Sequence, residues 1–61
     1  MPTTGITNWA ERVRALRVAE GWTQVELAAK LIVHVSTVSK WEQEVMVPDK
    51  RSRTRLKELG A

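Results

Sequence analysis

The sequence of 61 residues predicts a small all-α fold, a bundle of four short helices with a fifth as the alternative. Apolar residues recur at spacings of three and four, helix-capping residues precede these stretches, and a glycine follows the first one. A chain of this length buries only about 60% of the surface that its unfolded form exposes, so its helices must pack closely around a small core. We expect a single domain over residues 8–61.

The first helix is expected over residues 8–20. Residues 1–7 combine proline, glycine and threonine without helical periodicity, and we interpret them as a flexible N-terminal arm. Asn8 followed by Glu11 has the spacing of a capping box, which is typical of a helix start. Gly21 ends this helix, because glycine adopts the left-handed conformation of a helix C-terminus without steric cost.

A second helix is expected directly after Gly21. Thr23 and Glu26 have the spacing of a capping box, and Trp22 precedes them in the position of a hydrophobic staple. The buried stripe of this helix is predicted to consist of Leu27, Ala28 and Leu31. A small residue such as alanine in that stripe lets a neighbouring helix cross closely.

The third helix is expected over about residues 35–44, where Val38 and Trp41 share one face with Val45 as a further buried candidate. Residues 31–38 are rich in β-branched side chains, which by themselves favour a strand. We retain the helical interpretation because strong capping signals flank the segment and an isolated strand would have no partner.

A fourth helix is expected near the C-terminus. Pro48 closes the connection from the third helix, and either Asp49 or Ser52 can cap the helix that follows. Leu56 and Leu59 then have the spacing of a buried face. The chain ends soon afterwards, so little sequence is left for a fifth helix.

The composition excludes several classes of function. The chain has no cysteine and one histidine, which excludes disulfides and thiolate metal sites, so we expect no bound metal. No apolar run approaches the roughly 20 residues that span a bilayer, so we expect no membrane segment and a cytoplasmic location. We find no nucleophile–histidine–carboxylate arrangement and no glycine-rich phosphate loop, so we expect neither an enzyme nor a cofactor.

Positive charge is concentrated near the C-terminus, although the net charge is only +3. Five basic residues share this stretch: Lys50, Arg51, Arg53, Arg55 and Lys57. Such a face can hold phosphate groups. A solvated helix face is the alternative, and a charge run by itself favours that alternative.

Residues 23–42 have the pattern of two short helices joined by a tight connection, and the second helix carries small polar residues and a lysine on the face that its core residues leave free. This pattern is typical of a helix-turn-helix, whose second helix can lie in the major groove of DNA. From residue 13 to residue 48 the sequence resembles the phage-repressor family, the Cro and lambda-repressor-like proteins. The resemblance rests on Leu16-Arg17, Gly21-Trp22-Thr23-Gln24, Glu26-Leu27-Ala28, Val33, Ser36-Thr37-Val38-Ser39 and Trp41-Glu42.

The resemblance implies roles for particular residues. Base contacts are expected from the recognition helix, residues 35–44, through Val35, Ser36, Ser39 and Lys40. Phosphate contacts are expected from Thr23, Gln24, His34, Lys50 and Arg51. Arg17 and Glu42 match a pair that forms a semi-buried structural salt bridge in this family.

The sequence departs from the family pattern in the turn between the second and third helices. The family commonly has glycine where this chain has Ile32, and a β-branched residue with positive φ costs of order 1–2 kcal/mol. The usual serine or threonine cap of the recognition helix is replaced by His34. Ser36 could cap instead, which would start the helix two residues later and move Val35 out of the groove.

The sequence therefore predicts a sequence-specific DNA-binding transcription regulator of the phage or antitoxin type. We expect it to bind double-stranded DNA as a homodimer on a palindromic operator, with half-sites about one helical turn apart. The alternative is a protein-interaction module, an antitoxin or adaptor, that contacts a protein partner through Ile32, Val35, Val45 and Met46. Salt dependence separates the two, because phosphate contacts weaken steeply with salt and apolar contacts do not.

Overall fold

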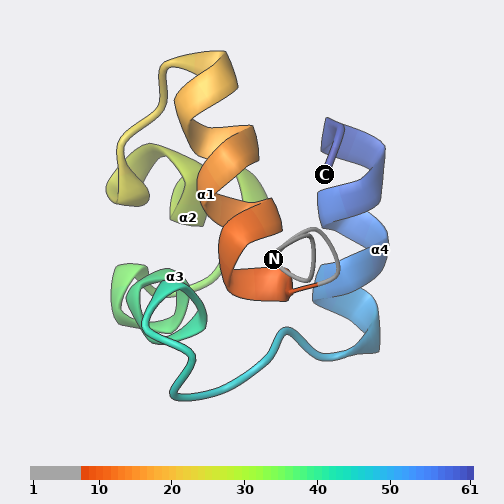
Figure 1. The fold of residues 1–61 in the computed structure, drawn as a ribbon. Helices are drawn as coiled ribbons and strands as arrows, with labels where there is room; N and C mark the ends of the chain where they lie inside the picture. Colours follow the sequence, from red (N-terminus) through yellow and green to blue (C-terminus); the bar gives the residue numbers. More distant parts are fainter. Residues whose placement is uncertain (1–7) are drawn as a thin grey trace, which may run out of the picture.

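The computed structural model describes residues 8–61, and these residues form four helices and no strand. The helices are α1 (Trp9–Glu20), α2 (Gln24–Leu31), α3 (Val35–Glu42) and α4 (Lys50–Leu59). Figure 1 shows α1 crossing in front of α2, with α3 below them and α4 on the opposite side of the view. Helix α3 packs against both α1 and α2, and α4 contacts α2. The all-α prediction is confirmed, while the predicted arm of residues 1–7 lies outside the described residues.

The helix starts follow the capping signals of the sequence. The Thr23 hydroxyl accepts from Glu26 N at 3.1 Å and the Glu26 carboxylate accepts from Thr23 N at 2.8 Å, which completes the predicted capping box. Asn8 caps α1 through Ala10 N at 2.7 Å rather than through Glu11 N, so the expected box at that position is reduced to a single cap. Asp49, the first of two candidate caps, is the N-cap of α4.

Helix α3 is shorter than predicted, because it ends at Glu42 rather than at residue 44. The chain leaves the helix through Glu44, whose φ of 64° lies in the left-handed region, and Val45 N then donates to Lys40 O at 2.9 Å. This turn rotates Val45 away from the face of Val38. Val45 is therefore 65% exposed, and its predicted burial is wrong.

The core is formed by the apolar faces of all four helices. Its buried members are Val13, Leu16, Leu27, Ala28, Leu31, Val38, Trp41 and Leu56. Trp9 and Trp22 lie half-buried at its rim, where Arg12 and Lys30 stack over their rings at 4.0 and 4.7 Å from the ring centroids. Among residues 8–61, no helix combines the length and the apolar character required to cross a membrane.

Candidate nucleic-acid interface

Helix α3 has two chemically different faces. Val38, Trp41 and Glu42 are buried against α1 and α2. On the opposite side, Ser36 and Lys40 are exposed, Ser39 is half-buried and Gln43 follows one turn later. We call Ser36, Ser39, Lys40 and Gln43 the recognition face. It presents hydroxyl, ammonium and amide groups, which can hydrogen-bond to base edges and phosphates.

Gln43 belongs to the recognition face, although it is not among the contact residues that the sequence predicts. Its side-chain Nε2 donates to the Ser39 hydroxyl at 2.6 Å, so the two side chains form one polar unit. Their spacing of four residues is the signal that could have identified this contact. Gln43 lies directly after the end of α3, where the prediction had extended the helix.

Val35 lies on a different side of α3 from Ser36. It is half-buried and packs against the core cluster, so only part of its side chain is available to a ligand. The sequence predicts Val35 among the base-contacting residues of the recognition helix. A contact between Val35 and a thymine methyl stays a prediction.

His34 is the N-cap of the recognition helix α3. Its Nδ1 accepts from Ser36 N at 3.0 Å and lies 2.8 Å from the Ser36 hydroxyl. A backbone N–H can only donate, so Nδ1 is unprotonated in this arrangement. Helix α3 therefore starts at Val35, and the alternative start two residues later is not formed.

The turn before α3 keeps the left-handed conformation despite its β-branched residue. Ile32 has φ 59° and ψ 48°, and its side chain is 80% exposed. Val33 N donates to Ala28 O at 3.0 Å, which closes the turn with the bonding pattern of a helix C-terminus. An isoleucine in this conformation costs of order 1–2 kcal/mol, and little burial offsets that cost.

A semi-buried ion pair, as the family resemblance implies, fixes the other end of α3 to α1. Arg17 Nε donates to Glu42 Oε2 at 2.7 Å and Arg17 Nη2 donates to Glu42 Oε1 at 2.9 Å. The Glu42 side chain is 4% exposed and that of Arg17 is 21% exposed. Because the geometry is bidentate and Glu42 is almost completely enclosed, the pair sets the orientation of α3 against α1.

The pKa shifts of Glu42 and Arg17 agree with a charged pair. Burial raises the pKa of the Glu42 carboxyl, but hydrogen bonds from Arg17 and Gln24 and the charges of Arg17 and Arg14 outweigh burial, so its pKa lies below the ordinary value. The hydrogen bond to Glu42 raises the pKa of Arg17. Both shifts favour the charged pair.

Two further residues, Gln24 and Arg14, join this pair. Gln24 Nε2 donates to Glu42 Oε1 at 3.2 Å, and Arg14 Nη2 donates to the Glu42 carbonyl at 3.2 Å. Gln24 is the first residue of α2 and was expected to bind a phosphate. One of its two amide hydrogens is directed to Glu42 here, which leaves the second for a phosphate. The role of Arg14 was not predicted, because no local pattern connects residues 14 and 42.

The remaining expected phosphate contacts lie on two separate elements. Thr23 is exposed at the N-terminus of α2. Lys50 and Arg51 are exposed in the first turn of α4. Within residues 8–61, no group of three His, Cys, Asp or Glu side chains is placed to hold a metal ion.

Comparison with known families agrees with the fold. A family model described as helix-turn-helix, of the Cro/C1 type, matches residues 13–51. The match covers more than half of the chain, and the chain belongs to this family of DNA-binding transcription regulators. A search of curated proteins and a search of solved structures found no match.

Proposed function

We propose that this protein is a sequence-specific transcription regulator that places α3 in the major groove of its operator. The observation that carries the proposal is the recognition face, a polar surface on a helix whose opposite side is anchored by Val38, Trp41 and Glu42. A rigidly anchored helix with a free polar face is suited to reading base edges. We propose a cytoplasmic location, where the DNA of a bacterial or phage-infected cell lies.

Five residues of the proposed interface have defined chemical roles. Lys40 can donate to guanine O6 and N7, and Ser36 and Ser39 can donate to or accept from base edges. Thr23 and Gln24 are placed at the N-terminus of α2, where a phosphate is favoured by the helix dipole. We propose no catalytic role and no cofactor.

We further propose that two copies bind one palindromic operator. A single module of this size contacts few base pairs, whereas a dimer doubles the contacts across two half-sites about one helical turn apart. A phage repressor and an antitoxin that controls its own operon both have this arrangement. The choice between these two roles is decided by the genes beside the operator.

The proposal is tested by two substitutions on the recognition face. Lys40→Ala should weaken binding to a selected operator by about tenfold or more, whereas Lys57→Ala, which removes the same charge from α4, should cost less. Ser36→Ala should change the preferred base pair at one operator position. Equal losses for both lysine variants, with no change of preference in Ser36→Ala, would indicate non-specific attraction only.

A protein-interaction module is the second candidate. Ile32, Val45 and Met46 expose 80%, 65% and 44% of their surface, and Val47 next to them is also exposed. An interface built on these side chains would be almost insensitive to salt, so the salt dependence of complex formation separates it from DNA binding.

A further inference from the structure

The first turns of helix α4 carry a repulsive arrangement of positive charges, which only the N-cap Asp49 offsets. Five of the ten residues of α4 are basic, its first turn contains no acidic residue, and Arg51 and Arg55 stand one helical turn apart. Cations near a helix N-terminus oppose the helix dipole, and like charges four residues apart repel each other. An anion bound beside this helix would reduce both costs.

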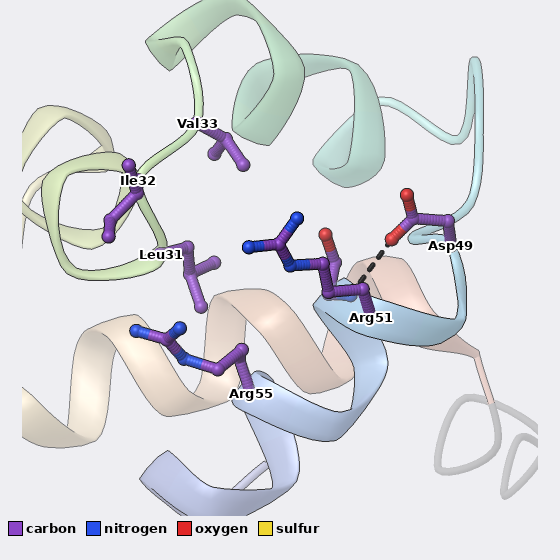
Figure 2. A pocket seen from close by; sticks show the side chains of 7 residues that line it. Leu31, Ile32, Val33, Asp49, Arg51 and Arg55 are labelled. Atoms are coloured by element: carbon purple, nitrogen blue, oxygen red, sulfur yellow. Dashed lines mark hydrogen bonds between the residues drawn. The ribbon is translucent and has the colours of Figure 1, made fainter.

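The structure contains a cavity at the place where such an anion would bind. The cavity has a volume of about 350 Å³ and lies between α4 and the turn that follows α2. Its walls are formed by Leu31, Ile32, Val33, Asp49, Arg51, Ser52 and Arg55. Figure 2 shows the side chains of Arg51 and Arg55 extending from α4 toward the end of α2 and the turn, on the same side of α4.

The two guanidinium groups are available to a ligand. Both ion pairs found in residues 8–61 involve Glu42, so neither Arg51 nor Arg55 has a carboxylate within ion-pair distance in that range. The charge of Arg51 acts at longer range on Asp49 and helps to lower the pKa of that carboxyl, whose oxygen is engaged by Ser52 N. Arg55 Nη2 donates to Lys30 O at 3.3 Å, which directs its side chain to the turn and leaves its other N–H groups free of that bond. The Asp49 carboxylate accepts from Ser52 N at 2.8 Å, so this amide is occupied and the site consists of side chains (Figure 2).

We infer that this cavity binds a phosphate group, with Arg51 and Arg55 each donating to its oxygens. Guanidinium groups match the geometry of phosphate oxygens and donate to them in pairs. The phosphate can come from the DNA backbone or from a small phosphate ester. The volume falls within the roughly 300–1,000 Å³ of small-ligand pockets, and Leu31 and Val33 supply an apolar wall for the rest of an ester.

The site extends the expected phosphate-binding residues to Arg55, which the sequence analysis placed only in a charge run. The sequence shows the spacing of Arg51 and Arg55 but not the turn that faces them, because that turn is more than fifteen residues away in the chain. The DNA source of the phosphate rests on the proposed function, whereas the small-ester source does not. The experiment therefore has two arms.

The first arm titrates the full chain with pyrophosphate at constant ionic strength and follows its backbone amides by NMR. We expect saturable shifts around Ile32, Val33 and Ser52. Arg51→Gln and Arg55→Gln should each weaken binding by about tenfold or more, whereas Arg53→Gln, which removes the same charge but does not line the cavity, should retain it. Shifts that do not saturate, or equal losses in all three variants, would overturn the inference.

The second arm identifies the source of the phosphate by titrating a duplex with wild-type and variant protein at several salt concentrations. If the source is the DNA backbone, pyrophosphate competes with the duplex and Arg55→Gln lowers the salt slope by about one, with a smaller effect for Arg53→Gln. If the source is a small ester, the two variants weaken duplex binding alike. A wild-type protein that binds no duplex would contradict the proposed function. The pyrophosphate titration of the first arm would still test whether the cavity binds phosphate.

Discussion

The two ends of the recognition helix α3 are fixed by different kinds of interaction. At the C-terminal end, Trp41 and Glu42 are buried, and Arg17 holds the Glu42 carboxylate with two hydrogen bonds. At the N-terminal end, an exposed Ile32 is in the left-handed conformation and an exposed His34 supplies the cap. The C-terminal end of α3 is held by buried tertiary contacts. The N-terminal end is held by local backbone geometry, and the left-handed conformation of Ile32 costs free energy there.

Because of this difference, one end of α3 mainly determines the stability of the domain and the other mainly determines how the recognition face is presented. The buried end determines how α3 sits on α1, and changes there should act on the folding of the whole domain. The exposed end determines where α3 begins and how Ser36 is presented, so changes there should have small effects on stability. Substitutions at the two ends of α3 should therefore differ in their effect on the free energy of unfolding.

Glu42→Ala should destabilise the domain by about 3 kcal/mol, because it leaves the Arg17 guanidinium without its enclosed partner. Glu44→Ala is the matched control, since Glu44 is exposed and lies two residues away. Chemical denaturation followed by circular dichroism measures both. Equal losses in the two variants would mean that the pair does not anchor α3.

Acid should remove the contribution of the same pair. The pKa of Glu42 is lowered in the folded state, so the unfolded chain binds the proton more readily, and the stabilisation is complete above the unfolded pKa of about 4.3. It is lost as the pH falls through the lower folded pKa. The stabilities of wild type and Glu42→Gln should therefore differ at pH 7 and converge in acid. Curves that stay parallel from pH 7 to pH 2 would contradict the assignment.

Ile32→Gly should stabilise the domain by about 1 kcal/mol, because glycine relieves the left-handed strain at a position with little burial to lose. Gly21→Ala is the reciprocal change in the turn after α1, where φ is 74° and an added Cβ meets nothing within 4 Å. It should cost about 1 kcal/mol through backbone conformation alone. Thermal unfolding measures both, and an unchanged or lower melting temperature for Ile32→Gly would refute the strain at this turn.

His34→Ala should cost up to about 1 kcal/mol, because Ser36 N loses its acceptor. His34→Asn should retain the stability, since asparagine is a favourable N-cap and its side-chain oxygen can accept the same bond. The melting temperature and the NMR shift of the Ser36 amide report the cap. A loss in His34→Asn as large as in His34→Ala would show that the ring acts through packing instead.

The helices could be predicted from sequence wherever the signal is local. The capping box of Thr23 and Glu26 and the turn at Gly21 were both identified, because their partners lie within a few residues. The β-branched segment of residues 31–38 forms a helix end, a turn and a helix start, since burial of Leu31 and Val38 outweighs its strand propensity. The predicted end of α3, near residue 44, is wrong, because a glutamate gives no sequence signal for the left-handed conformation that Glu44 adopts.

The interface could be predicted only in part. The pairing of Arg17 with Glu42 followed from family resemblance, and the spacing of the recognition helix indicated Ser36, Ser39 and Lys40. The contacts of Gln24 and Arg14 with Glu42 join different helices, so no periodicity indicates them. The same reason applies to Arg55, whose place beside the turn depends on how α4 packs against α2.

Recognition of DNA by α3 can be tested by selecting binding sites from a random duplex library with the purified protein and titrating the selected duplex at several salt concentrations. We expect a palindrome with half-sites about one helical turn apart, bound with a steep salt dependence. We also expect Lys40→Ala to change the selected half-site. Failure to enrich any sequence, with only weak binding that salt abolishes, would contradict the claim that the recognition face reads DNA.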